Sequence, residues 1–256
     1  MRSIAVLGNL TRDVVDGGPS RPGGAPFYAA KALRLGGLPA RIAAKCAPAD
    51  RALVLGLASL GVPISWLPAA ATAAFSFSYG ENGTRRMIVE ELGEPWTPRE
   101  ARESVRGEWV HVGALTRADF PTETIAALAR RSHVSFDGQG LVRPGRTGVL
   151  ELDADFDPDL LRHVRVLKLS EEEAEVVGDV AGLSVPEVVV TRGERGSVVW
   201  WRGRRHDVPA QPPRPVHDPT GAGDAFAAGY VAARAGGYRP PGAARRASQL
   251  VASLLR

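Results

Sequence analysis

Hydrophobic and polar residues follow one another along the chain in blocks of two kinds. Short apolar runs are typical of buried strands, and we predict such strands at residues 4–8, 41–45, 62–67, 109–113, 134–137, 164–169 and 187–191. Segments with apolar residues at helical spacing separate them, at residues 25–36, 50–60, 121–131, 171–177, 221–234 and 241–255. Because buried strands that alternate with helices are typical of a mainly parallel sheet covered on both faces, this pattern predicts a three-layer α/β/α sandwich.

One segment departs from this alternation. Residues 74–80 alternate aromatic with small or polar side chains, residues 81–83 read Glu-Asn-Gly, and residues 84–91 return with a second alternation. The pattern predicts an antiparallel hairpin with one apolar and one polar face. An isolated hairpin is only marginally stable in water, so it should cover another part of the protein. It either extends the main sheet or forms a small β-hairpin lid, at about residues 73–92, over a substrate pocket.

Composition narrows the class of protein. The chain has 256 residues, of which 44% are hydrophobic and 23% charged, as expected for a globular protein that forms one large domain over residues 1–256. No apolar run approaches the roughly 18 residues that cross a bilayer, and the N-terminus has no signal peptide pattern. The single cysteine, Cys46, excludes an intrachain disulfide and fits a cytoplasmic location.

The charge distribution argues against nucleic acid as a partner. The net charge is +4, but the arginines are scattered, and lysine occurs only at positions 31, 45 and 168. No basic stripe interleaved with aromatic residues is present, as a nucleic-acid surface would require. We therefore expect a small anionic ligand such as ATP rather than a nucleic acid or a membrane.

The segment at residues 218–226, DPTGAGDAF, is the most informative part of the sequence. A glycine-rich turn that opens a helix points unpaired backbone N–H groups forward, and with the helix dipole they form an anion site. A carboxylate beside such a site suits proton abstraction from a hydroxyl while a phosphoryl group is held nearby, which makes Asp224 a candidate general base. The alternative is an ordinary helix start, since Gly and Asp are common there.

DPTGAGDAF resembles the C-terminal signature of the PfkB/ribokinase family of carbohydrate kinases. Further segments resemble the family in the same order along the chain: residues 8–13, 23–30, 168–173 and 189–196. The phrases GGAPFYAA, SYGENGTRR and FDGQGLVR are most similar to the compact subgroup that includes myo-inositol kinases. The resemblance implies a ribokinase-like fold, ATP as phosphate donor, Mg²⁺ and, in some members, a monovalent cation. Since the paired glycines already come at residue 23, we expect almost no lid segment after the first strand.

The resemblance also implies roles for individual residues. The catalytic group is Asp224 with the backbone of Gly221, Ala222 and Gly223. The substrate would be held by Asp13, Gly23, Gly24, Tyr28, Arg86 and Asp137. The nucleotide would be held by Lys168, Thr191, Gly193, Gly196 and Thr220, and the metal ion, through water, by Glu173.

Three positions qualify the resemblance. Tyr28 stands where the family often has an asparagine, which favours a sugar or polyol stacked on a ring. Ser170 replaces the asparagine of the magnesium element. Asp218 matches the residue that helps to bind a monovalent cation in some members.

The sequence therefore predicts an ATP-dependent kinase of a small sugar or polyol, myo-inositol among them, acting as a monomer or homodimer. Two alternatives stay open. One is a nucleoside or sugar-acid kinase with the same fold, and the other is a kinase-like protein that senses its ligand without turnover. A dinucleotide-binding oxidoreductase is disfavoured, because Gly8-Asn9-Leu10 and not GxGxxG follows the first strand.

Overall fold

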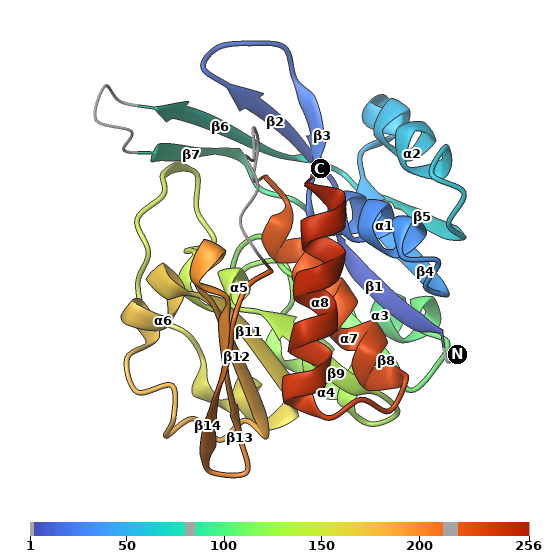
Figure 1. Ribbon diagram of the computed structural model, residues 1–256. Helices are drawn as coiled ribbons and strands as arrows, with labels where there is room; N and C mark the ends of the chain where they lie inside the picture. The colour runs from blue at the N-terminus through green and yellow to red at the C-terminus, as the bar shows by residue number, and fades with distance from the viewer. Residues whose placement is uncertain (1–2, 80–84, 212–219, 256) are drawn as a thin grey trace.

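A computed structural model describes residues 3–79, 85–211 and 220–255. Within these residues the chain forms two sheets, one of nine strands and one of five. The larger sheet lies in the middle of the protein between two layers of helices, and the smaller sheet crosses one end of it (Figure 1).

The central sheet has the strand order β14-β13-β12-β11-β9-β8-β1-β4-β5. Seven neighbouring strands pair in parallel: β1 (Ile4–Asn9), β4 (Ala40–Cys46), β5 (Ile64–Pro68), β8 (Trp109–Gly113), β9 (His133–Asp137), β11 (Val166–Ser170) and β12 (Glu187–Thr191). An antiparallel hairpin, β13 (Ser197–Trp201) and β14 (Arg204–Val208), extends one edge. The mainly parallel sheet expected from the apolar runs is thus confirmed, while the edge hairpin was not predicted.

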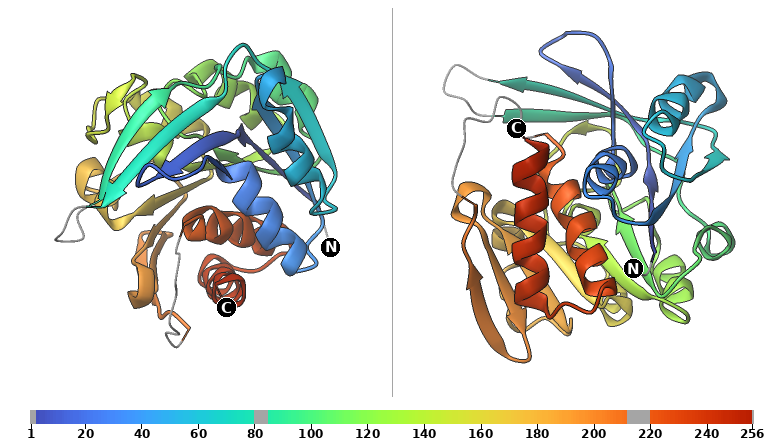
Figure 2. Two further views of the ribbon diagram at one scale, coloured as in Figure 1. Left: turned by 90° about the horizontal axis from the view of Figure 1, so that it is seen from above. Right: turned by 45° about the vertical axis from the view of Figure 1, so that its right-hand side comes forward.

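Side chains alternate between the two faces of this sheet, and each face has its own core. In β1, Val6 belongs to the core under α1 (Ala25–Leu35), α7 (Ala222–Ala235) and α8 (Pro240–Leu254). Its neighbour Leu7 belongs to the core under α3 (Pro98–Ser104), α4 (Thr122–Ala129), α5 (Gln139–Val142) and α6 (Glu171–Val177). Figure 2 shows α1, α7 and α8 together on one side of the sheet. The three-layer prediction is therefore confirmed.

The remaining helical segments lie around this frame. Helix α2 (Arg51–Ala58) follows the 3-10 turn η1 (Pro48–Asp50), and two further 3-10 turns are η2 (Pro158–His163) and η3 (Gly193–Arg195). None of the helices in the described residues combines the length and hydropathy that crossing a bilayer would take.

The smaller sheet, which we call the lid sheet, has the order β10-β7-β6-β2-β3. Its strands are β2 (Thr11–Val15), β3 (Arg21–Gly23), β6 (Ala73–Tyr79), β7 (Arg85–Glu91) and β10 (Gly148–Val149). The predicted hairpin forms β6 and β7, and its apolar residues Phe75 and Val89 pack with Leu115. The expectation that almost no lid segment follows the first strand was wrong. Residues 11–23 form two lid strands, which the Pro- and Gly-rich composition of residues 17–24 concealed.

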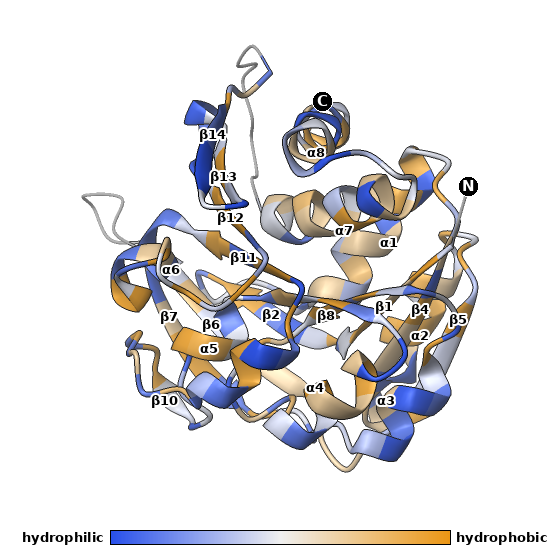
Figure 3. Ribbon diagram, turned by 90° about the horizontal axis from the view of Figure 1, so that it is seen from below, coloured by the Kyte–Doolittle hydropathy of each residue, from blue (hydrophilic) through white to orange (hydrophobic). Residues whose placement is uncertain are grey.

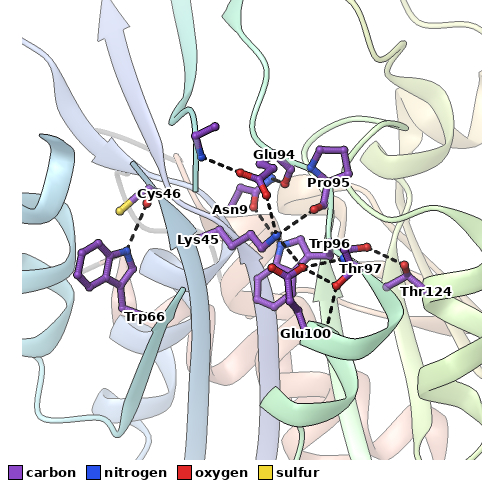
Figure 4. A network of polar contacts seen from close by, with 11 residues as sticks. Asn9, Lys45, Cys46, Trp66, Glu94, Pro95, Trp96, Thr97, Glu100 and Thr124 are labelled. Carbon is purple, nitrogen blue, oxygen red and sulfur yellow. Dashed lines mark hydrogen bonds and ion pairs between the residues drawn. The ribbon is translucent and has the colours of Figure 1, made fainter. Parts of the chain in front are cut away.

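A buried lysine, Lys45, holds the chain segment that leads from the lid sheet back to the central sheet (Figure 4). The ammonium of Lys45 donates hydrogen bonds to the carbonyl oxygen of Pro95 and to Oε2 of Glu100, both at 2.9 Å, and its side chain is 1% exposed. The indole N–H of Trp96 donates to Oδ1 of Asn9 at the end of β1 (3.0 Å). These contacts hold residues 94–100 against the carboxyl ends of β1 and β4, and so define the base of the lid sheet.

Candidate active site

The glycine turn and the start of α7 have the conformation that the motif requires. Gly221 has a φ of 79°, in the left-handed region that favours glycine. A β-carbon at this position would also lie 2.0 Å from Cδ1 of Tyr28 in α1, so the ring of Tyr28 packs directly against the turn. Helix α7 begins at Ala222, and Asp224 is the acidic residue of its first turn and is half-buried.

Two strands of the central sheet bring charged groups to the same place. Asp137 at the end of β9 pairs in register with Lys168 of β11, and Nζ of Lys168 lies 3.3 Å from Oδ2 and 3.4 Å from Oδ1 of Asp137. A β-carbon at Gly223 would lie 3.1 Å from the same Nζ. The ammonium of Lys168 therefore lies directly below the first turn of α7, at the carboxyl ends of the strands, where open α/β sheets bind ligands.

The charges in this cluster shift one another's proton affinity. Burial raises the pKa of Asp224 to about 7, and the nearby carboxylate of Asp137 adds to this, while Lys168 acts in the opposite direction. Burial alone would lower the pKa of Lys168, but Asp137, Glu173 and Asp224 outweigh it and raise that pKa. Asp224 thus stands near its midpoint at neutral pH, as a general base should, while Lys168 stays charged.

Glu173 lies near Lys168 and Asp137, and it also stabilises the start of α6. Its Oε2 accepts the backbone N–H of Ser170 (2.8 Å), and Oγ of Ser170 accepts the backbone N–H of Glu173 (3.2 Å). This capping box starts α6 and accounts for Ser170 at a position where an asparagine was expected. Burial raises the pKa of Glu173, Lys168 lowers it and Asp137 raises it, with a net increase.

The described residues contain no group of three or more His, Cys, Asp or Glu side chains arranged to hold a metal ion. The ammonium of Lys168 stands among the acidic side chains instead. The donor set therefore fits Mg²⁺ that is carried mainly by substrate phosphates, with Glu173 contributing through water, better than a metal cage built by the protein.

The expected substrate residues of the first strand region meet in the lid sheet. A β-carbon at Gly23 would lie 2.0 Å from Oδ2 of Asp13 and 2.4 Å from Oγ1 of Thr11, so both side chains converge on this glycine. Gly24 has a φ of 88° and is the N-cap residue of α1. Asp13 shares its face of the lid sheet with Phe75 and Val89, because these residues pair in register.

Arg86 is not brought to this group. It pairs with Ser78 on the opposite face of the lid sheet and is exposed. Asp218 lies outside the described residues.

Three of the expected nucleotide residues, Thr191, Gly193 and Gly196, lie at the end of β12 and in the turn after it. Thr191 ends β12 and donates its hydroxyl to the carbonyl oxygen of Leu169 (3.2 Å). Gly193 has a φ of 54° and open space around it, whereas a β-carbon at Gly196 would lie 2.2 Å from the carbonyl oxygen of Val208. Gly193 is thus placed for a ligand to approach, while Gly196 is needed for packing. Thr220 is exposed and lines a pocket of about 400 Å³ with Tyr28.

The structure adds two polar residues that sequence reasoning left without a role, Thr11 and His111, and it also involves Arg143, which the sequence offered as a contact to the nucleotide or substrate. Thr11 is 1% exposed, and its Oγ1 has no hydrogen-bond partner among the described residues. His111 of β8 is fully buried with Nδ1 3.2 Å from Oγ of Ser135, and burial lowers its pKa to about 4. Arg143 influences the pKa of Asp137, Glu173 and Asp224. A polar residue inside an apolar run was the available signal for His111.

Comparison with known proteins places the chain among kinases. The family model described as "pfkB family carbohydrate kinase" matches residues 152–255. A fructokinase of Klebsiella pneumoniae is 30% identical in an alignment that covers 90% of this chain and 83% of the fructokinase. A nucleoside kinase of Methanocaldococcus jannaschii is 29% identical over 41% of this chain, and an inositol 3-kinase of Zea mays is 36% identical over 43%. These last two alignments span only 35% and 30% of the relatives' own lengths.

The fold has a counterpart among solved structures. A pyrophosphate-dependent kinase in the ribokinase family, complexed with a pyrophosphate analog and myo-inositol, superposes with a TM-score of 0.85 over 99% of this chain and 95% of that one, at 22% identity. This likeness confirms the ribokinase-like fold. The fructokinase alignment and the family model confirm the predicted enzyme class: the chain belongs to the PfkB family of carbohydrate kinases.

Proposed function

We propose that this protein transfers a phosphoryl group from ATP to a hydroxyl of a small sugar or polyol, with Asp224 as the general base. The observation that carries the proposal is the half-buried Asp224 carboxyl, with a pKa raised to about 7, in the first turn of α7 beside Lys168. A base of this pKa takes a proton efficiently at neutral pH. The proton of the attacking hydroxyl passes to Asp224 while the hydroxyl oxygen bonds to the γ-phosphorus, and the bond from this phosphorus to the bridging oxygen breaks to release ADP.

The turn before α7 supplies the electrostatic part of the mechanism. The backbone N–H groups of Gly221, Ala222 and Gly223 lie at the positive end of α7 and would stabilise the oxygens of the transferring phosphoryl group. Lys168, directly below Gly223, adds a fixed positive charge. Mg²⁺ bound to the nucleotide would neutralise phosphate charge, and Glu173 would contact it through water.

The acceptor is a polyhydroxylated molecule held under the lid sheet. Asp13 and Thr11 converge there on Gly23, and they offer a carboxylate and a hydroxyl to substrate hydroxyl groups. Inositol 3-kinases, fructokinases and nucleoside kinases all occur among the relatives, so sugars, polyols including myo-inositol, and nucleosides form the panel to be tested. The location that fits such a kinase is the cytoplasm.

The test measures ADP release with each acceptor, and phosphate release when pyrophosphate replaces ATP as donor. Pyrophosphate is included because a structural neighbour with a TM-score of 0.85 depends on it. We expect Asp224→Asn to lower turnover by at least about 100-fold while thermal stabilisation by a non-hydrolysable nucleotide persists. The control is Asp155→Asn, an exposed carboxylate outside the cluster, which should leave turnover unchanged.

Two results would contradict the proposal. Near-normal turnover of Asp224→Asn would remove Asp224 from its role. Stabilisation by acceptors without release of ADP or phosphate would instead support the kinase-like sensor.

A further inference from the structure

A pocket of about 560 Å³ lies at the end of the molecule opposite the lid sheet. Its lining consists of Arg165, Pro186, Trp201, Arg202, Arg234, Arg239 and Pro240. These residues come from the starts of β11 and β12, the end of β13, the last turn of α7 and the start of α8. Figure 3 shows the β13–β14 hairpin beside α8 at this end. The pocket is therefore a concave site assembled from five segments that are distant in sequence.

The pocket is distinct from the candidate active site. Asp224 stands in the first turn of α7 and Arg234 near its end. Ten residues of helix separate them by about 15 Å along the axis.

Positive charge in the pocket exceeds the negative charge available to balance it. Nη2 of Arg234 lies 2.7 Å from Oε1 of Glu187, and Nε of Arg165 lies 3.7 Å from the same oxygen. Glu187 is thus shared between two arginines. Neither Arg202 nor Arg239 forms an ion pair within the described part of the chain, and both are exposed. Among the residues that the structure describes, Arg239 therefore carries no ion pair and Arg202 is engaged only with the Trp201 ring, beside Arg165, which is loosely paired.

The helix at the rim adds to this field. Helix α8 has 15 residues, begins at Pro240 and has no acidic residue in its first turn. Its positive dipole end therefore stands uncompensated beside Arg239.

The pocket also has an aromatic wall, formed by Trp201 with Arg202 stacked on its ring. Trp201 is half-buried, with the guanidinium carbon of Arg202 4.8 Å from its ring centre. An indole favours a ring-shaped ligand, and guanidinium groups bind phosphate in pairs of hydrogen bonds.

We propose that this pocket binds a small phosphorylated ring compound, either a nucleotide or a phosphorylated polyol. Arg165 and Arg239 would hold the phosphate, joined by Arg202 when the ring of the ligand takes its place against the indole of Trp201. Arg234, already held by Glu187 and by the carbonyl oxygen of Tyr238, would form a fixed positive wall.

The test follows the indole N–H resonance of Trp201, assigned with Trp201→Phe, during titration of the full chain. The probes are AMP, myo-inositol 1-phosphate and inorganic phosphate, at physiological salt. We expect a saturable shift of this resonance with AMP or with the inositol phosphate. The compound that binds more tightly shows whether the ligand is a nucleotide or a phosphorylated polyol. The Arg202→Ser/Arg239→Ser double variant should weaken binding by about tenfold or more.

The matched control is Arg102→Ser/Arg130→Ser. It removes the same charge from exposed residues on the opposite layer of the protein and should change affinity by less than about twofold. Both variants alter exposed side chains, and thermal unfolding verifies that they fold.

Three results would overturn the proposal. One is the absence of a saturable shift with either ring compound up to about 10 mM. Another is an equal loss of ligand affinity in the pocket variant and in the control variant, because the loss would then come from the change in net charge alone. The third is that inorganic phosphate binds as tightly as the ring compounds.

Discussion

Replacing Gly221 by alanine tests the packing of the glycine turn that precedes α7. The residue has a φ of 79°, where an L side chain is disfavoured by about 1–2 kcal/mol. The new β-carbon would also lie 2.0 Å from Cδ1 of Tyr28, and forcing extra atoms into a packed site typically costs about 1–3 kcal/mol. Gly221→Ala should therefore lower the free energy of unfolding by about 2–5 kcal/mol.

The chain offers a control for the backbone contribution. Gly193 also has a positive φ, 54°, but no atom lies within 4 Å of the position its β-carbon would take. Gly193→Ala should therefore show only the backbone penalty, about 1–2 kcal/mol. The difference between the two variants measures the contact with Tyr28.

The assay is urea unfolding followed by circular dichroism, with linear extrapolation to water. A double-mutant cycle with Tyr28→Ala should recover about 1–3 kcal/mol of the loss caused by Gly221→Ala, because the smaller side chain makes room for the new methyl group. If Gly221→Ala is no more destabilising than Gly193→Ala, or if the cycle shows no coupling, the packing of Tyr28 on the turn is refuted.

Four further predictions concern the charged groups. In the free enzyme, kcat/KM should rise with pH through an apparent pKa of about 7, because Asp224 must be ionised to accept a proton; a pH-rate profile flat from pH 5 to 9 would contradict this. The same raised pKa means that the folded protein binds more protons than the unfolded chain between about pH 4 and 7, so Asp224 lowers stability as pH rises through this window. Asp224→Asn should therefore be more stable than the wild type at pH 8, with the gain disappearing towards pH 4, as urea unfolding at both pH values would reveal. Lys168→Met should move the apparent pKa of kcat/KM further upward, since Lys168 lowers the pKa of Asp224, and an unchanged or lower value would contradict that placement. Lys45→Met should lower Tm by roughly 4–12 °C, corresponding to about 2–3 kcal/mol, because a buried ammonium and two hydrogen bonds are lost; Lys31→Met, at an exposed lysine, should change Tm little.

The parallel core was predictable because its strands are continuous apolar runs. The edge hairpin escaped prediction because β14, Arg204–Val208, reads as a polar segment and becomes a strand only by pairing with β13. The lid strands β2 and β3 escaped for a related reason, since Pro and Gly argue against strands in isolation. Tertiary pairing, which single-sequence patterns do not contain, decided all three cases.

The candidate site was likewise predictable only in part. The pattern of residues 218–226 indicated the helix start with Asp224, and Lys168 was identified at the end of a predicted strand. Their convergence depends on the register of β9 with β11 and on the packing of Gly223 over Lys168, which no local pattern encodes. The burial of Thr11 and His111 has the same origin. Ser170 is explained by its own neighbourhood, because the capping box with Glu173 is a local pattern.

Glu187 ties two layers of the protein at one point. It is the first residue of β12, fully buried, and it accepts hydrogen bonds from the hydroxyl of Tyr230 (3.0 Å) and from Nε and Nη2 of Arg234 (2.8 and 2.7 Å, to different oxygens). All three donors belong to α7, and all three bind one residue of the central sheet. These hydrogen bonds oppose any sliding of α7 along its axis and any rotation about it. We therefore expect α7 to keep its position on the central sheet, so that any closure over a substrate would have to come from the lid strands while Asp224 stays in place.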